Sequence, residues 1–165
     1  MPRDVYKRRD AVLALSEAKD IFDEDKPIEA REAAIAASKG SPDLIPGAAM
    51  AARSYIAQGN PKHAARILKK TWSVEPHPDL AAAFAEIAPA ETPAERMKRF
   101  RDLTSIKPDH RETRLLKAEL ALAAEDFPEA RRAMGDLVDR EPDARVLTVM
   151  AAIARGEGAE EPVVR

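Results

Sequence analysis

The chain has 165 residues, 45% of them apolar and 34% charged, a net charge of −2 and no cysteine. This composition excludes a disordered chain, disulfides, thiolate nucleophiles and cysteine-ligated zinc, and it argues against nucleic-acid binders, which usually carry a basic excess. Aromatic residues make up only 4%, so we expect a core of alanine and aliphatic side chains, which suits closely packed helices better than a sheet.

Two interleaved series of prolines run along the chain. One series is Pro42, Pro76, Pro108 and Pro142, and the other is Pro27, Pro61, Pro93, Pro128 and Pro162. Within each series the spacing is 32 to 35 residues. Proline is tolerated in the first turn of a helix, and just past a helix end it stops further winding. The second series therefore begins helices and the first series follows them, so each period holds two helices.

Apolar residues recur at three- and four-residue steps between the prolines, which is typical of helices. The first helices of the pairs are predicted at 8–25, 44–58, 79–88, 112–125 and 144–155. The second helices are predicted at 27–39, 61–74, 93–106 and 128–140. Asn60 is expected to cap the helix that begins at Pro61, and Thr92 with Glu95 forms a capping box in sequence.

A 34-residue period with two helices is the tetratricopeptide signature. The best repeat has small residues at Ala52 and Ala64, an aromatic residue at Tyr55, Gly59 at the end of the first helix and a closing proline. We therefore predict an all-α fold, a right-handed α-solenoid of antiparallel helix pairs in a single domain, 1–165. The repeats are expected at 8–42, 43–76, 77–108 and 109–142, with a partial repeat at 143–165.

Two parts of this pattern are irregular. The third repeat is two residues shorter than the others and has Arg96 where a small residue is expected, so its packing is the least regular. Pro162 is in register to begin the second helix of a fifth repeat, yet the sequence ends at Arg165. We therefore expect either that the sequence is a fragment of a longer protein, which is the favoured interpretation, or that a partner covers this end.

No catalytic constellation is visible, and we expect the protein not to be an enzyme. The three histidines, His63, His77 and His110, form no metal-binding motif, so no metal site is expected. His77 lies between two prolines, which favours a structural turn over a ligand. The six glycines form no phosphate-binding loop.

Binding is the natural use of a helical solenoid, because the first helices of the pairs line its concave face. This geometry predicts a partner-binding face of Leu15, Lys19, Phe22, Met50, Arg53, Ile56, Leu115 and Glu119. The face is mainly apolar and suits an amphipathic helix or an extended peptide as partner. A clamp for a carboxyl-terminal carboxylate, of the type built from asparagines and lysines, is not expected, because the one asparagine is predicted to cap a helix.

Several segments resemble the carboxyl-terminal part of HemY-type tetratricopeptide proteins, which proteobacteria use in association with heme biosynthesis. The resemblance lies in the run 6–13, in Pro42-Asp43-Leu44-Ile45-Pro46, in the run 64–72 that ends in Lys-Thr-Trp, in Pro76-His77-Pro78-Asp79-Leu80 and in the run 106–115. It covers nearly the whole chain, and the His-Pro-Asp-Leu segment is its most specific part.

The resemblance implies the soluble part of an inner-membrane protein on the cytoplasmic face, tethered by membrane segments that this sequence lacks. It implies a role in organising late heme-synthesis enzymes or in handling porphyrin intermediates, and we expect a scaffold with those enzymes as partners. We expect no cofactor and, from the balanced charge, no nucleic-acid partner. One alternative is a heme or porphyrin carrier with His77 or Tyr55 as the iron ligand. A further alternative is a general envelope-assembly scaffold unrelated to heme.

Overall fold

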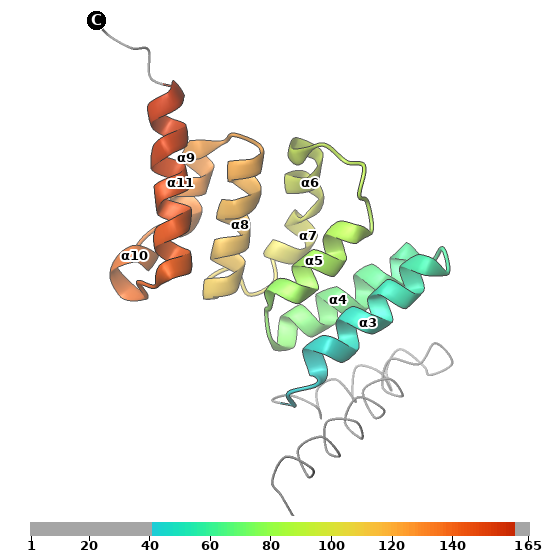
Figure 1. The fold of residues 1–165 in the computed structure, drawn as a ribbon. Helices are drawn as coiled ribbons and strands as arrows, with labels where there is room; N and C mark the ends of the chain where they lie inside the picture. The colour runs from blue at the N-terminus through green and yellow to red at the C-terminus, as the bar shows by residue number, and fades with distance from the viewer. Residues whose placement is uncertain (1–40, 161–165) are drawn as a thin grey trace, which may run out of the picture. The chain divides into compact units, whose positions relative to one another are not determined.

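The computed structural model describes residues 41–160, which are helical throughout apart from short turns (Figure 1). The chain divides into two compact units, one ending at Pro89 and the other beginning at Ala90. This boundary falls inside the short third repeat. The helices expected before residue 41, with Leu15, Lys19 and Phe22, and the helix start expected at Pro162 lie outside the described residues.

In the first unit, α3 (Leu44–Ala57), α4 (Pro61–Val74) and α5 (Pro78–Glu86) pack against one another. The turn between α3 and α4 is short, so these two helices run antiparallel. Their contact is built from small side chains, since Ala48, Ala52 and Ala64 are fully buried. Larger side chains close the core around them: Leu44, Tyr55, Leu68, Trp72, Leu80 and Phe84.

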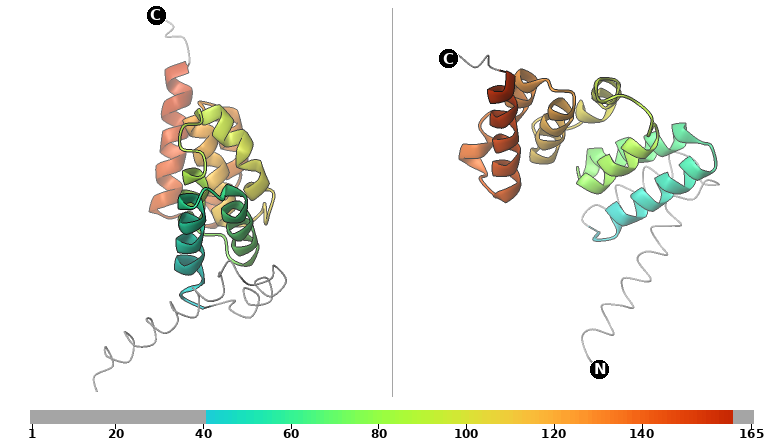
Figure 2. Two further views of the ribbon diagram at one scale, coloured as in Figure 1. Left: turned by 90° about the vertical axis from the view of Figure 1, so that its right-hand side faces the viewer. Right: turned by 45° about the horizontal axis from the view of Figure 1, so that its top comes forward.

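The second unit contains α6 (Pro93–Arg99), α7 (Arg101–Thr104), α8 (Arg111–Ala123), α9 (Phe127–Met134), α10 (Leu137–Arg140) and α11 (Ala144–Glu160). The central helix is α8, which packs against α6, α7, α9 and α11. The last helix, α11, lies along both α8 and α9 (Figure 2). The core consists of Leu115, Ala118, Ala121, Ala130, Met134, Leu137, Val146, Val149 and Ile153.

The same turn joins the helix pair in both units. Gly59 and Glu125 are two repeats apart, and both have a positive φ, of 76° and 58°. The next residue, Asn60 or Asp126, donates its backbone N–H to the carbonyl five residues earlier, at 2.8 Å in each case. This is a Schellman turn, which satisfies carbonyl groups left open at a helix end. The residue that closes it is also the N-cap of the following helix.

The proline series predicted the helix boundaries well for α4, which begins at Pro61 and ends at Val74 as expected. The prediction was wrong for two other second helices. The helix expected at 93–106 is interrupted at Phe100 and ends at Thr104. The helix expected at 128–140 is interrupted at Gly135, whose φ of 51° and ψ of −121° do not fit a right-handed helix.

The last described helix is longer than expected, since α11 continues past Arg155 to Glu160. By repeat spacing, Ala159 stands where Gly59 and Glu125 make their turns. Ala159 keeps a negative φ and stays within α11. The helix therefore runs straight through this position.

The helix caps agree with the sequence only in part. Thr92 and Glu95 form the predicted capping box, with hydrogen bonds of 3.2 and 3.1 Å. Asn60 stands at the N-cap of α4, but its side chain makes no cap hydrogen bond. Its Oδ1 lies 2.8 Å from Nδ1 of His63 instead. The predicted capping role of the Asn60 side chain is therefore wrong.

Gly156 lets α11 approach α9 closely. A Cβ added there would lie 2.0 to 2.6 Å from the Phe127 ring, which is itself buried. Gly158, two residues later in the same helix, would meet nothing within 4 Å. The two glycines therefore differ in packing but share a helical backbone.

Gly156→Ala is expected to lower the free energy of unfolding by about 1–3 kcal/mol, because overpacking outweighs the helix propensity of alanine. Gly158→Ala is the matched control and should raise it by about 0.5–1 kcal/mol. Urea unfolding followed by far-UV circular dichroism measures both. Equal effects of the two substitutions would contradict the close contact, and Phe127→Leu should relieve the cost of Gly156→Ala.

Opposite substitutions at the two Schellman turns test whether the turns share one backbone geometry. Glu125→Gly should stabilise the second unit by about 1 kcal/mol, because a non-glycine residue pays for its positive φ. Gly59→Ala should destabilise the first unit by a similar amount. Fluorescence of Trp72, the one tryptophan of the chain, follows the first unit, and circular dichroism follows both. A stabilising Gly59→Ala would refute the shared geometry.

Candidate functional site

Three of the predicted partner-binding residues lie on α3. Met50 is 42% exposed, which makes it one of the two large apolar side chains most open to solvent between residues 41 and 160. Arg53 pairs with Glu86 of α5 at 2.7 Å, and Ile56 is half-buried. The Arg53–Glu86 pair is about half exposed, so it contributes little to stability and orients the two side chains.

The corresponding face of the second unit is more polar. Arg145 of α11 donates two hydrogen bonds to the carboxylate of Glu112 on α8, at 2.9 and 2.6 Å, and a third to Glu119 at 3.3 Å. Glu119 is exposed, as expected for this face. Leu115 is fully buried in the core of the unit. The prediction that Leu115 lies on the partner-binding face is wrong, because its side chain packs in the core.

A group that the sequence did not reveal is Arg114. Its guanidinium donates to the carbonyls of Ala133 and Met134 at 3.3 and 2.7 Å, and to the carboxylate of Asp136 at 3.0 Å. The helix break at Gly135 frees these carbonyls. Arg114 therefore closes the end of α9 from a neighbouring helix, and its hydrogen bond holds the pKa of Asp136 below the ordinary value.

Glu91 organises the start of α6 in the second unit. Its carboxylate accepts hydrogen bonds from Arg99 at 2.8 and 2.6 Å and from Arg96 at 2.9 Å, and its side chain is 9% exposed. Arg96 thus has a defined partner at the position where a small residue was expected. The hydrogen bond from Arg99 lowers the pKa of Glu91 most, burial opposes it, and Arg96 lowers the pKa further.

Asp143 and Glu157 also have lowered pKa values, and an arginine contributes to each. Backbone N–H donation from Val146 lowers the pKa of Asp143 most, and the Arg111 guanidinium adds to it. Arg131 lowers the pKa of Glu157 through a hydrogen bond. Each of these acids is tied to an arginine, so much of the charge on this unit is already neutralised within the chain.

His77 and His110 have the same role in successive repeats. The Nδ1 atom of each accepts the backbone N–H two residues later, at 3.0 and 3.1 Å, and so caps α5 and α8. This confirms the structural role expected for His77. An accepting Nδ1 carries no proton, so the neutral ring holds its proton on Nε2. A histidine that binds a metal normally donates a proton from its other nitrogen.

Tyr55 is 3% exposed and stacks on His63, with ring centroids 5.4 Å apart and an interplanar angle of 25°. A buried phenol does not present its oxygen to a bound porphyrin. His77 would lose its cap if Nε2 became an iron ligand. The two candidate heme ligands therefore do not fit that role in this structure.

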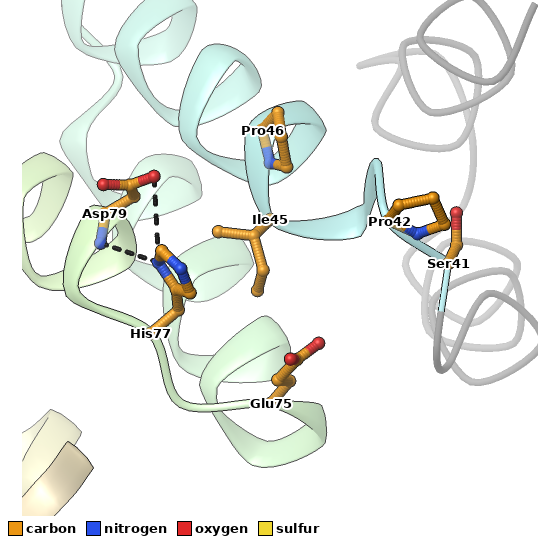
Figure 3. Close-up of a pocket in the computed structure, with 7 residues that line it drawn as sticks. All are labelled: Ser41, Pro42, Ile45, Pro46, Glu75, His77 and Asp79. Atoms are coloured by element: carbon orange, nitrogen blue, oxygen red, sulfur yellow. Dashed lines mark hydrogen bonds and ion pairs between the residues drawn. The ribbon is translucent and has the colours of Figure 1, made fainter. Parts of the chain in front are cut away.

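A pocket of about 300 Å³ opens in the first unit beside the amino-terminal ends of α3 and α5. It is lined by Ser41, Pro42, Ile45, Pro46, Glu75, His77 and Asp79. Figure 3 shows Ile45 at its centre, with His77 and Asp79 on one side and Glu75 on the segment before His77. No group of three or more potential metal ligands occurs within 41–160.

None of the helices in the described part of the chain combines the length and apolar character that crossing a membrane requires. Paired helices joined by short turns, with cores of small and aliphatic residues, define an α-helical repeat protein of the solenoid class. This confirms the predicted fold class for the residues described.

Comparison with known families then specifies the repeat. Residues 92–153, which lie in the second unit, match the family described as "Tetratricopeptide repeat". This stretch is similar to tetratricopeptide repeats. No curated protein and no solved structure matches the chain.

Glu91→Gln is expected to lower the free energy of unfolding by about 1 kcal/mol at neutral pH. A carboxylate whose folded pKa is lowered stabilises the fold above its unfolded pKa, and this stabilisation is lost as the pH falls through the folded pKa. The difference between variant and parent should therefore be constant down to about pH 5 and shrink below it. A difference that grows on acidification would contradict the assignment, as urea unfolding at several pH values can show.

Proposed function

We propose that the protein is a non-catalytic scaffold that binds protein or peptide partners through the first helices of its repeats. The tetratricopeptide match carries the proposal, because helical repeats of this kind use extended surfaces for recognition. Met50, Arg53 and Ile56 on α3 and Glu119 on α8 are the proposed contact residues. The exposed Met50 suits an apolar anchor of a partner, since methionine adapts to irregular surfaces.

A more specific proposal, about the partners and the place of action, rests on the resemblance to HemY-type proteins. The partners would be late heme-synthesis enzymes, and the chain would act at the cytoplasmic face of an inner membrane through segments outside this sequence. The segment Pro76-His77-Pro78-Asp79-Leu80 supports this proposal, because a generic tetratricopeptide repeat does not require it. A general envelope-assembly scaffold uses the same fold and differs only in its partners.

A heme or porphyrin carrier is less well supported. His77 is engaged as a helix cap and Tyr55 is buried against His63, so either ligand would have to give up a contact that holds the first unit together. Titration with hemin tests this alternative. A saturable Soret shift that disappears in His77→Asn, which keeps a capping side chain, would restore the carrier alternative.

The scaffold is tested with the purified chain immobilised in an extract from a heme-producing proteobacterium. We expect late heme-synthesis enzymes to be enriched, and Met50→Glu to reduce the recovery at least threefold, because it places a charge on an apolar contact. Ala94→Glu is the matched control, since it adds the same charge at an exposed position of α6.

Two results would contradict these proposals in different ways. Enrichment of other proteins, still sensitive to Met50→Glu, would keep the scaffold and remove the link to heme. Equal recovery with Met50→Glu and Ala94→Glu would remove the proposed contact face.

A further inference from the structure

The pocket beside α3 and α5 is acidic where the structure describes it. Within residues 41–160 its lining includes two carboxylates, Glu75 and Asp79, and no lysine or arginine. Asp79 lies 3.7 Å from Nδ1 of His77, which already accepts the backbone N–H of Asp79. The Glu75 carboxylate has no hydrogen-bond or ion-pair partner among residues 41–160, and its side chain is exposed.

The second unit contains the same place in the repeat, 66 residues further along the chain. Counting from the closing prolines, the equivalent pairs are Ile45 and Arg111, Pro46 and Glu112, Glu75 and Glu141, His77 and Asp143, and Asp79 and Arg145. The two sets therefore occupy corresponding helix starts and turns, with different side chains.

In the second unit an arginine side chain occupies this place. The Arg111 guanidinium donates to the carbonyl oxygen of Glu141 at 3.2 Å and pairs with the carboxylate of Asp143. Arg145 binds Glu112 through two hydrogen bonds beside it. Both arginines at this place are thus paired within the chain, Arg111 with Asp143 and Arg145 with Glu112.

In the first unit both cations are missing. Ile45 replaces Arg111 and ends in a methyl group, and Asp79 replaces Arg145. At the place that is equivalent by repeat spacing, where the second unit holds a guanidinium, the first unit has the 300 Å³ pocket. Two carboxylates remain around it, and Ile45, Pro42 and Pro46 provide an apolar wall.

We propose that this pocket binds an arginine side chain presented by a partner protein. The planar guanidinium can donate to Glu75 and Asp79 together, while its aliphatic stem packs on Ile45 and the two prolines. The occupant fills the place that the Arg111 side chain takes at the equivalent turn, but it pairs with other groups, since Arg111 binds the carbonyl oxygen of Glu141 and the carboxylate of Asp143. This inference rests on the proposed scaffold function and adds that the partner presents an arginine side chain.

The test uses the ¹⁵N-labelled full chain and N-acetyl-arginine amide as the probe. We expect saturable chemical-shift changes confined to residues 42–46 and 75–80, with a dissociation constant on the order of 1 mM. The lysine analogue should bind several-fold more weakly, because an ammonium ion lacks the planar fork. The glutamine analogue should cause no saturable change.

Two variants distinguish binding of the probe in the pocket from general electrostatic attraction. Glu75→Gln, at a carboxylate without a hydrogen-bond or ion-pair partner within residues 41–160, should weaken binding at least threefold, and Glu75→Gln with Asp79→Asn at least tenfold. The control pair, Asp102→Asn with Glu125→Gln, removes two exposed carboxylates of the second unit and should leave binding unchanged.

Equal binding of the arginine and lysine probes, equal loss in the control pair, or no saturable change at all would overturn the proposal. Each of these outcomes concerns the pocket alone. The recovery of partners by the immobilised chain tests the scaffold separately, so the two proposals fail independently.

Discussion

Close approach of neighbouring helices is the constraint on which the rest of this structure depends. Ala48, Ala52 and Ala64 in the first unit, and Ala118 and Ala130 in the second, are fully buried where paired helices meet. Small side chains at these positions let the backbones pack tightly, and the larger aliphatic and aromatic side chains then fill the space on either side. The short Schellman turns follow from the same constraint, because closely packed antiparallel helices leave room for few connecting residues.

The small residues and the turns recur in both units, whereas the side chains at other equivalent positions differ. Equivalent sites hold His77 and Asp143 as N-caps, and Ile45 and Arg111 at the start of the first helices. In the second unit these differences produce a network of ion pairs, and in the first unit they leave a pocket with two carboxylates. Variation at repeat-equivalent positions therefore gives one backbone two different surfaces.

The repeat and most helix boundaries could be predicted from the sequence, because proline and the Thr92–Glu95 capping box act through local backbone chemistry. The helix break at Gly135 could not, since a glycine inside a helical pattern is often tolerated and Arg114 supports the break from another helix. The burial of Leu115 was also missed, because a one-residue error in helical phase turns a side chain by about 100°. The ion pairs and the pocket depend on side chains far apart in sequence, which a periodic pattern does not specify.

Urea unfolding of Ala64→Leu against Ala57→Leu, read by Trp72 fluorescence, tests the close helix contact most directly. Ala64 is fully buried between the helices and Ala57 is exposed on α3. We expect Ala64→Leu to lower the free energy of unfolding by about 1–3 kcal/mol, and Ala57→Leu to change it by about 0.5 kcal/mol at most. Equal midpoints for the two variants would contradict an architecture held together by alanine contacts.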